Sequence, residues 1–295
     1  MKVLILGGQG MLGHRLWVNL QAEHEIWVTV RQDFNPFPTL PHYNRERVVL
    51  GVNADNFNQI TDTLDKIGPD LVINCIGIIK QRKEESQNPV QTIAINSLLP
   101  HQISQACEKA KIRMVQISTD CVFSGKRGNY TEEDDSDAGD LYGRSKFLGE
   151  VTELSHCITL RTSIIGHELQ TRLGLVEWFL NHRDGECVNG YKNAIFSGFT
   201  TDELSRLIND FVLPRPELSG LYQVSSDPIS KYDLLSLINS FYQRKIIINP
   251  DEQFKIDRSL NSSHFRRETG YSPPSWPAMV QGMANGSKQY EKLVH

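Results

Sequence analysis

The feature that most restricts the fold of this chain is a glycine motif near its start. An apolar run within Lys2–Leu6 leads into Gly7-Gly8-Gln9-Gly10-Met11-Leu12-Gly13, and a helical pattern then covers Met11–Gln21. The unbroken run predicts a strand buried on both faces. Glycines allow a tight turn and let a phosphate approach the helix N-terminus, where N–H groups favour anions. Without the strand and the helix the motif would be only a glycine-rich turn; in this context it predicts a dinucleotide-binding turn made by Gly7, Gln9, Gly10, Met11, Leu12 and Gly13.

Short β-rich runs alternate with helical patterns through the first half of the chain, which predicts an α/β fold with a Rossmann-type, doubly wound parallel sheet. The pattern loosens after about Arg161. We expect residues 1–162 to form the dinucleotide-binding domain and residues 163–295 a smaller mixed α/β C-terminal substrate lobe, from which segments return to the first domain. The predicted strands are Lys2–Leu6, His24–Val30, Arg47–Leu50, Leu71–Ile76, Ile112–Ile117, His156–Leu160, Leu221–Val224 and Lys245–Ile248. The predicted helices are Met11–Gln21, Asn56–Ile67, Val90–Ala110, Leu173–Asn181, Thr201–Phe211 and Ser230–Tyr242, and Asn189–Asn193 is predicted as a connection.

Composition argues against several classes of protein. The 295 residues include 31 Lys and Arg against 35 Asp and Glu, which gives a net charge of −4, and 39% are hydrophobic. This argues against disorder and, without a large basic cluster, against nucleic-acid binding. We expect no membrane span and no leader peptide, because no apolar run is long enough. Five separated cysteines without a CxxC pair, and histidines without an HxxxH or HExxH pattern, predict a cytoplasmic protein without disulfides or a metal site.

The end of the second predicted strand bears on which dinucleotide binds. In such folds an acidic residue there holds the ribose diol of NAD, and a basic residue pairs with the 2′-phosphate of NADP. Arg31 follows this strand, and its guanidinium suits a phosphate, whereas Asp33 is close enough in sequence to reach a ribose. Arg31 would otherwise be an ordinary surface arginine. We expect NADPH as the cofactor, with NADH as the alternative.

Tyr142 and Lys146 form a YxxxK pair on a predicted helix, so both side chains lie on one face, one turn apart. An ammonium beside the phenol would lower its pKa from about 10 and allow acid–base chemistry at neutral pH. Such pairs are common on exposed helices, but this one follows a predicted strand that ends in Ser118-Thr119-Asp120. Parallel strands bind ligands at their carboxyl ends. Thr119 therefore offers a hydroxyl to a substrate oxygen, unless these residues only cap a turn.

Together these motifs resemble the extended short-chain dehydrogenase/reductases, and within them the dTDP-4-dehydrorhamnose reductases and related reductases of nucleotide-linked 4-keto-6-deoxy sugars. The resemblance is specific up to about residue 166. It implies that Thr119, Tyr142 and Lys146 form the catalytic set, with Tyr142 protonating the developing alkoxide and Lys146 also holding the nicotinamide ribose. It further implies that NADPH delivers hydride to C4 of the sugar without a metal. Cys75, Ile76 and Gly77 would lie where the fourth strand of the family runs past the cofactor, and they would contact it. The matching segments are Gly7–Gly13, Asn74–Gly77, Ser118–Gly125, Tyr142–Lys146 and Leu160–Ser163.

Two departures narrow what the resemblance implies. Dehydratases of the family carry Thr-Asp-Glu, whereas Cys121 stands at the third position here, which disfavours elimination of water. The dTDP-4-dehydrorhamnose reductases usually carry a tryptophan after Arg-Thr-Ser, where this chain has Ile164. A UDP-linked 2-acetamido-2,6-dideoxy-4-hexulose therefore fits at least as well as dTDP-4-dehydrorhamnose, and surface polysaccharide precursors would be the products. Weaker substrate-binding candidates are Lys80, Asp120, Val122, Phe123 and Asn193.

Two other functions fit the same motifs. An epimerase or epimerase-reductase acting on similar sugars would need a further acid–base residue beside C3 or C5, which the sequence does not reveal. A non-catalytic NADP-binding subunit is the rival from another class, since the resemblance extends to a regulatory subunit of methionine adenosyltransferase. The intact Tyr142 and Lys146 pair argues against that rival. The expected partners are a nucleotide-sugar substrate and, in a homodimer, a second copy of the chain, with neither nucleic acid nor a membrane.

Overall fold

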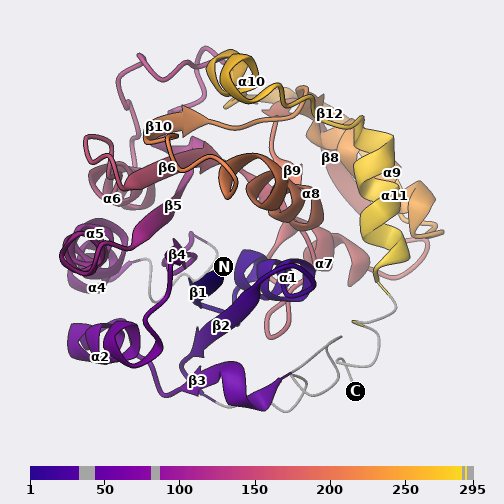
Figure 1. Cartoon of the computed structure of the whole chain (residues 1–295). Coiled ribbons are helices and arrows are strands. Elements are labelled where there is room, and N and C mark those ends of the chain that lie inside the picture. Colours follow the sequence, from indigo (N-terminus) through magenta and orange to yellow (C-terminus); the bar gives the residue numbers. More distant parts are fainter. Residues whose placement is uncertain (33–43, 81–86, 288–289, 291–295) are drawn as a thin grey trace.

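A seven-stranded parallel sheet forms the centre of the computed structural model, which describes residues 1–32, 44–80, 87–287 and 290. The strand order is β10-β6-β5-β4-β1-β2-β3, and every strand runs parallel to its neighbours (Figure 1). The expected Rossmann-type, doubly wound fold is thus confirmed. Its strands are β1 (Lys2–Leu6), β2 (Glu25–Val30), β3 (Val48–Leu50), β4 (Leu71–Asn74), β5 (Arg113–Thr119), β6 (Cys157–Thr162) and β10 (Gly220–Gln223).

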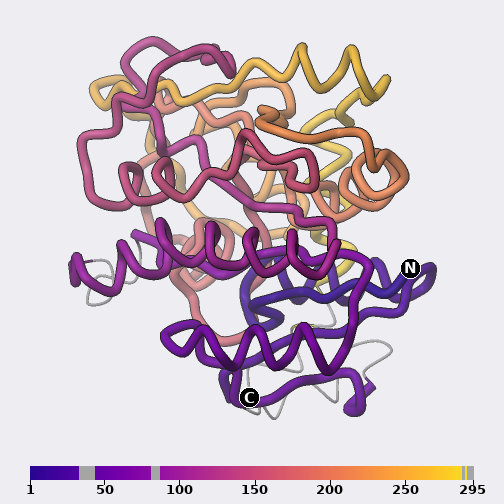
Figure 2. The backbone as a smooth tube through the Cα atoms, turned by 60° about the vertical axis from the view of Figure 1, so that its left-hand side comes forward, coloured from indigo at the N-terminus to yellow at the C-terminus, as the bar shows by residue number. Residues whose placement is uncertain are grey.

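Strand β1 shows why the sheet needs helices on both faces. Its side chains alternate between two cores: Val3 and Ile5 pack into one, and Leu4 and Leu6 into the other. Helices α2 and α5 cover the face that carries Leu4, and they lie side by side (Figures 1 and 2). The elements on this face are α2 (Phe57–Ile67), α4 (Pro89–Ile93) and α5 (Leu99–Ala110).

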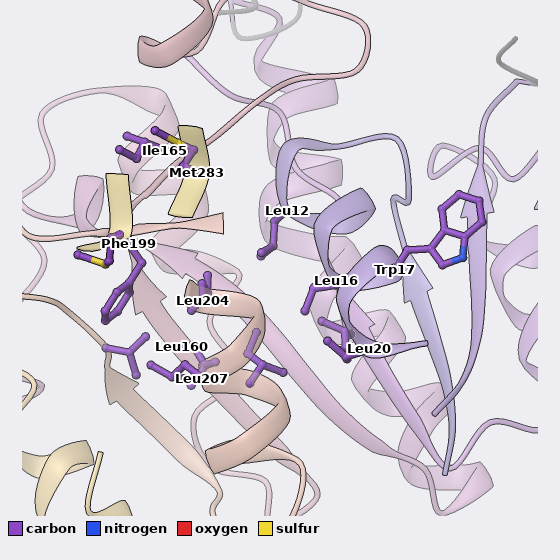
Figure 3. Close-up of a cluster of buried hydrophobic side chains, with 14 of the residues drawn as sticks. Leu12, Leu16, Trp17, Leu20, Leu160, Ile165, Phe199, Leu204, Leu207 and Met283 are labelled. Carbon is purple, nitrogen blue, oxygen red and sulfur yellow. The ribbon is translucent and has the colours of Figure 1, made fainter. Parts of the chain in front are cut away.

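The opposite face is covered by α1 (Met11–Leu20) and α8 (Thr201–Leu207), which come from the two halves of the sequence. Leu12, Leu16 and Leu20 recur every four residues and form one apolar stripe on α1. This stripe lies on the side of α1 that faces Leu204 of α8 (Figure 3). Both helices thus share one hydrophobic core with the sheet, which joins the two halves of the chain.

The rest of the second half forms a smaller, mixed α/β lobe. Strand β8 pairs in parallel with β12 and antiparallel with β11, and β7 pairs with β9. The boundary near residue 162 stays a prediction. Among the helices in the described ranges, none is long and apolar enough to cross a membrane. The lobe contains β7 (Ile164–Ile165), α7 (Leu175–Leu180), β8 (Cys187–Phe196), β9 (Phe199–Thr200), β11 (Ile229–Ser230), α9 (Lys231–Phe241), β12 (Ile247–Asp257), α10 (Ser263–Thr269) and α11 (Trp276–Asn285).

Four segments differ from the sequence prediction. The expected connection Asn189–Asn193 lies inside β8, because pairing with β12 overrides the low strand propensity of Gly and Asn. The strand predicted to end at Ile248 continues to Asp257 as β12. The long helix predicted over Val90–Ala110 contains a π-helical turn, η3 (Ala94–Leu98), just before α5, and a second π-helical turn, η5 (Ile208–Val212), follows α8. Such turns are frequent at functional sites.

Candidate functional site

Two connected clefts open at the carboxyl ends of the central strands, near the point where the strand order reverses between β1 and β4. Such a reversal is where open α/β sheets bind their ligands. The large cleft has a volume of about 1600 Å³ and is lined by both halves of the chain. The adjoining cleft has a volume of about 810 Å³. Both are lined by Gln9, Gly10 and the segment 75–78, so they are continuous.

The glycine turn lies where the two clefts meet. Gly7 has a φ of +88°, a left-handed conformation that favours glycine. A Cβ on Gly13 would lie 2.2 Å from the carbonyl oxygen of Gly7, so only glycine lets α1 begin this close to β1. Gly10 is the N-cap of α1 and has no side chain to accept a hydrogen bond from the first N–H groups. The turn therefore fits the diphosphate of a dinucleotide.

Gln9 ties the glycine turn to the end of β2. Its Oε1 accepts a hydrogen bond from the Arg31 N–H at 3.3 Å, and its Nε2 donates to the carbonyl oxygen of Gln32 at 2.9 Å. Arg31 is exposed and lines the adjoining cleft, as a residue that contacts the far end of a dinucleotide should. Asp33, the acidic alternative, lies outside the described residues.

Thr119 ends β5, and Tyr142 lies on α6 (Leu141–Leu148); both line the large cleft and their side chains are hydrogen-bonded. Burial raises the pKa of Tyr142 above its usual value, and the hydrogen bond with Thr119 opposes this rise. The prediction that the nearby lysine lowers the pKa of Tyr142 is therefore wrong. The free-energy cost of removing the phenolate from water outweighs any attraction between the phenolate and the ammonium. Tyr142 keeps its proton at neutral pH and has one to donate.

Lys146 is buried one turn further along α6. Its Nζ donates a hydrogen bond to the carbonyl oxygen of Ile117 at 2.8 Å. Burial lowers the pKa of Lys146 to about 8, and the negative charge of Glu150 opposes the change. A Cβ on Gly77 would lie 3.8 Å from Nζ, so the ammonium also faces the segment shared by both clefts.

Two glycines let α6 approach its neighbours closely. A Cβ on Gly143 would lie 2.2 Å from the carbonyl oxygen of Cys121, in the turn η4 (Asp120–Val122) that follows Thr119. A Cβ on Gly149, the C-cap of α6, would lie 1.9 Å from the carbonyl oxygen of Asn96. These contacts place Tyr142 beside Thr119.

Asn96 is a residue of the site that sequence reasoning missed. Its Oδ1 accepts a hydrogen bond from the Ile78 N–H at 2.8 Å, and its Nδ2 donates to the carbonyl oxygen of Ile78 at 3.0 Å. The same Nδ2 donates to Ser145 Oγ on α6 at 3.2 Å. Asn96 thus joins the segment shared by both clefts to the helix that carries Tyr142. Its only signal in the sequence was an amide side chain that directly follows the apolar residues Ile93, Ala94 and Ile95 of a predicted helix.

A buried ion pair supports the end of β5. Arg161 donates two hydrogen bonds to Glu150, at 2.8 and 2.7 Å, and Ser118 Oγ donates to the same carboxylate at 2.6 Å. Both side chains of the ion pair are 3% exposed. A two-pronged, charge-assisted contact of this kind has a well-defined geometry. It connects the end of α6 to β5 and β6 directly below Thr119.

The structure brings two of the five weaker substrate candidates to the large cleft. Lys80 and Asp120 line it, and Lys80 forms an ion pair with Asp140 and lies 5.8 Å from the ring centroid of Tyr142. Met11 and Leu12 of the glycine motif line the same cleft. The cleft therefore contains a lysine close to the side chain that has a proton to donate.

The other three candidates lie elsewhere. Val122 and Phe123 are fully buried in a small core with Tyr130 and Leu260, because the turn after Thr119 directs them inward. Asn193 is exposed on β8 and donates a hydrogen bond to the carbonyl oxygen of Glu252 at 2.8 Å, away from the cleft lining. Sequence reasoning also missed further residues that line the large cleft, among them Phe196, Glu168, Gln170 and Lys231.

The described residues include no group of three or more His, Cys, Asp or Glu side chains that could hold a metal ion.

The class of protein follows from three features: a parallel sheet, a glycine turn at the strand-order reversal and a Tyr–Lys pair beside that turn. Together they define a Rossmann-fold protein of the extended short-chain dehydrogenase/reductase class.

Comparison with known proteins assigns the chain within this class. The family model of the RmlD substrate binding domain matches residues 1–180, and the chain belongs to that family. The chain is 29% identical over 151 residues to "Probable low-salt glycan biosynthesis reductase Agl14" of Haloferax volcanii, which covers 51% of this chain and 48% of that protein. It thus spans about half the length of that relative.

Two further similarities cover more of the chain. The beta subunit of methionine adenosyltransferase 2 of Danio rerio is 23% identical over 248 residues, which are 80% of this chain and 72% of that protein. The crystal structure of dTDP-4-dehydrorhamnose reductase from Bacillus anthracis in complex with NADP superposes with a TM-score of 0.76 at 21% identity. It covers 96% of this chain and 98% of that chain, which shows a shared fold.

Because α6 lies so close to η4, we expect two neighbouring Gly→Ala substitutions to change the free energy of unfolding by different amounts. Gly143→Ala should lower the free energy of unfolding by about 1–3 kcal/mol, because its Cβ would meet backbone rather than a side chain that can move. Gly139→Ala is the matched control, since a Cβ there has no neighbour within 4 Å. Urea unfolding measures both. Equal unfolding midpoints for the two variants would contradict the packing described for α6.

Proposed function

We propose that the protein is an NADPH-dependent reductase of the C4 keto group of a nucleotide-linked 4-keto-6-deoxyhexose, acting in the synthesis of surface polysaccharide precursors. The observation that carries this proposal is the meeting of Thr119, Tyr142 and Lys146 at a cleft continuous with the glycine turn. Membership of the RmlD substrate binding domain family supports it. The similarity to a protein named as a glycan biosynthesis reductase supports it further.

The cofactor would be held by residues of both clefts. The glycine turn would hold the diphosphate, and Arg31 would pair with the 2′-phosphate that distinguishes NADPH from NADH. The similar fold of a protein solved in complex with NADP supports this choice, and NADH stays the alternative. When bound, NADPH supplies a hydride. The residues proposed to contact it are Gly7, Gln9, Gly10, Met11, Leu12, Gly13, Arg31, Cys75, Ile76, Gly77, Tyr142 and Lys146.

The three proposed catalytic residues position the carbonyl, donate the proton and stabilise the resulting phenolate. Thr119 Oγ1 donates a hydrogen bond to the C4 carbonyl oxygen and holds it beside Tyr142. Tyr142 Oη donates its proton to the same oxygen as the carbonyl becomes an alcohol. The Lys146 ammonium stabilises the phenolate that Tyr142 leaves behind, in a buried site where charges act strongly. Burial keeps Tyr142 protonated at neutral pH, so the proton that this role requires is present.

The cleft favours reduction over the alternative chemistry. Cys121 lines it at the position where the family's dehydratases carry a glutamate, and burial raises the pKa of this thiol to about 12. A neutral thiol does not supply the carboxylate that elimination of water needs. Ile164 lines the cleft at the position where dTDP-4-dehydrorhamnose reductases usually carry a tryptophan, so a UDP-linked 2-acetamido sugar and dTDP-4-dehydrorhamnose both stay candidates. The homodimer and the cytoplasmic location stay predictions.

The second candidate function is a non-catalytic subunit, which the similarity to a beta subunit of methionine adenosyltransferase favours. Tyr142→Phe distinguishes it from a reductase. We expect kcat to fall by about 10²–10⁴-fold, because the proton donor is lost, while the Kd for NADPH stays within about twofold. NADPH oxidation with either 4-keto sugar measures kcat, and Tyr191→Phe, on β8 outside the cleft lining, is the matched control. A Tyr142→Phe variant that retains most of its turnover would refute the mechanism.

Arg31 allows a test of cofactor preference. Arg31→Ala should raise the Kd for NADPH by about 10–100-fold, because charge-assisted hydrogen bonds to the 2′-phosphate are lost, and should barely change the Kd for NADH. Fluorescence titration with each nucleotide measures both constants. Arg183→Ala, an exposed arginine of the lobe, is the control. An equal loss of affinity for both nucleotides would make Arg31 an ordinary surface residue.

The pKa of Lys146 predicts the alkaline limb of activity. As the pH rises through about 8, Lys146 loses its proton and the phenolate loses its stabilising charge, so kcat/KM should fall. Loss of the Lys146 proton does not destabilise the folded state in this pH range, so unfolding caused by Lys146 cannot explain the fall in kcat/KM. The folded-state pKa lies below the ordinary 10.5, so the unfolded chain binds more protons between these pH values, and the contribution of Lys146 to stability rises there. A kcat/KM that is flat or rising through pH about 8 to 9 would contradict the assigned role.

A further inference from the structure

Lys231 is a cation of the large cleft to which neither the motifs nor the proposed reaction gives a role. It is the first residue of α9, and its side chain lines the cleft on the side of the lobe. The helix is held by Leu234, Leu235 and Ile238, which are buried, so the backbone of Lys231 has a fixed position. Its Nζ lies 4.2 Å from the ring centroid of Phe196, which also lines the cleft.

The ammonium of Lys231 has no carboxylate within ion-pair distance among the described residues. Burial lowers its pKa, and the more distant carboxylate of Asp120 acts in the opposite direction. Asp120 is itself buried and is influenced more strongly by Arg258 than by Lys231. Lys231 is therefore a partly dehydrated cation whose charge the protein does not neutralise by direct contact.

The other lysines of the cleft have direct protein partners. Lys80 is paired with Asp140, and Lys146 donates to the carbonyl oxygen of Ile117. Among the lysines that line the large cleft, Lys231 is therefore the one whose ammonium a substrate anion can contact.

We propose that Lys231 binds the diphosphate of the nucleotide-sugar substrate, an inference that rests on the proposed function. The diphosphate is the strongly anionic group of such a substrate, and it is attached at C1, across the pyranose ring from C4. An ammonium without a carboxylate partner is stabilised when this anion arrives, and the contact is stronger in a partly dehydrated cleft. Lys231 thereby orients the sugar so that its C4 carbonyl lies at Thr119 and Tyr142.

Calorimetric titration of the NADPH-saturated protein with UDP and with dTDP tests the proposal. For the nucleotide diphosphate that the unmodified chain binds more tightly, Lys231→Met should raise the Kd by about 10–100-fold, and Lys231→Arg should restore most of the affinity. The affinity for the matching nucleoside, which lacks phosphates, should change by less than about twofold. Lys192→Met is the matched control, because Lys192 pairs with Glu252 on the exposed part of β8.

Three outcomes overturn the inference, and they are distinguishable. If the unmodified chain binds neither UDP nor dTDP, the nucleotide-sugar substrate itself is wrong. If Lys231→Met binds the diphosphate as tightly as the unmodified chain, the role of Lys231 is wrong and the reductase proposal stands. If Lys231→Met loses affinity for the nucleoside and the diphosphate equally while retaining NADPH, the residue shapes the cleft instead of binding the diphosphate.

Discussion

The close contact of α6 with the backbone on both of its sides is the constraint on which the site depends. Gly143 lies against the carbonyl oxygen of Cys121 and Gly149 against that of Asn96, with no space for a Cβ at either position. A helix held at this distance places Tyr142 at the end of β5, where Thr119 can reach it. It also places Lys146 deep enough for burial to lower its pKa to about 8. The chemistry of the proposed site thus follows from backbone packing.

Hydrogen bonds and an ion pair hold α6 in the position that the backbone packing gives it. Asn96 hydrogen-bonds both Ile78 in the segment shared by the clefts and Ser145 on α6, so a shift of either element would leave buried polar atoms without partners. The buried ion pair of Arg161 and Glu150 likewise holds the end of α6 against β5 and β6. Breaking such a pair on one side costs about 3–5 kcal/mol, which makes the arrangement rigid. A rigid site suits a reaction in which a proton donor must lie close to one carbonyl oxygen.

The predictions that agree with the structure rest on local signals. The strand Lys2–Leu6 and the turn Gly7–Gly13 needed only an apolar run and glycine spacing, and both occur where the sequence placed them. The wrong expectation for the pKa of Tyr142 had another origin, because a sequence shows a neighbouring lysine but not the burial that outweighs it. Asn96 and Lys231 were missed because they reach the site through folding of distant segments, and nothing near them in sequence marks them.

The central claim is that a hydride is added to C4 of a nucleotide-linked 4-keto sugar and that Tyr142 supplies the proton. The most direct test uses NADPH deuterated at the transferred position, with mass spectrometry and nuclear magnetic resonance of the sugar product. Our account predicts one deuterium at C4, and no enzyme-dependent solvent deuterium at C3 or C5 when unlabelled NADPH is used in heavy water. An unreduced sugar that gains solvent deuterium at C3 or C5 only with the protein present would contradict the account and identify an epimerase.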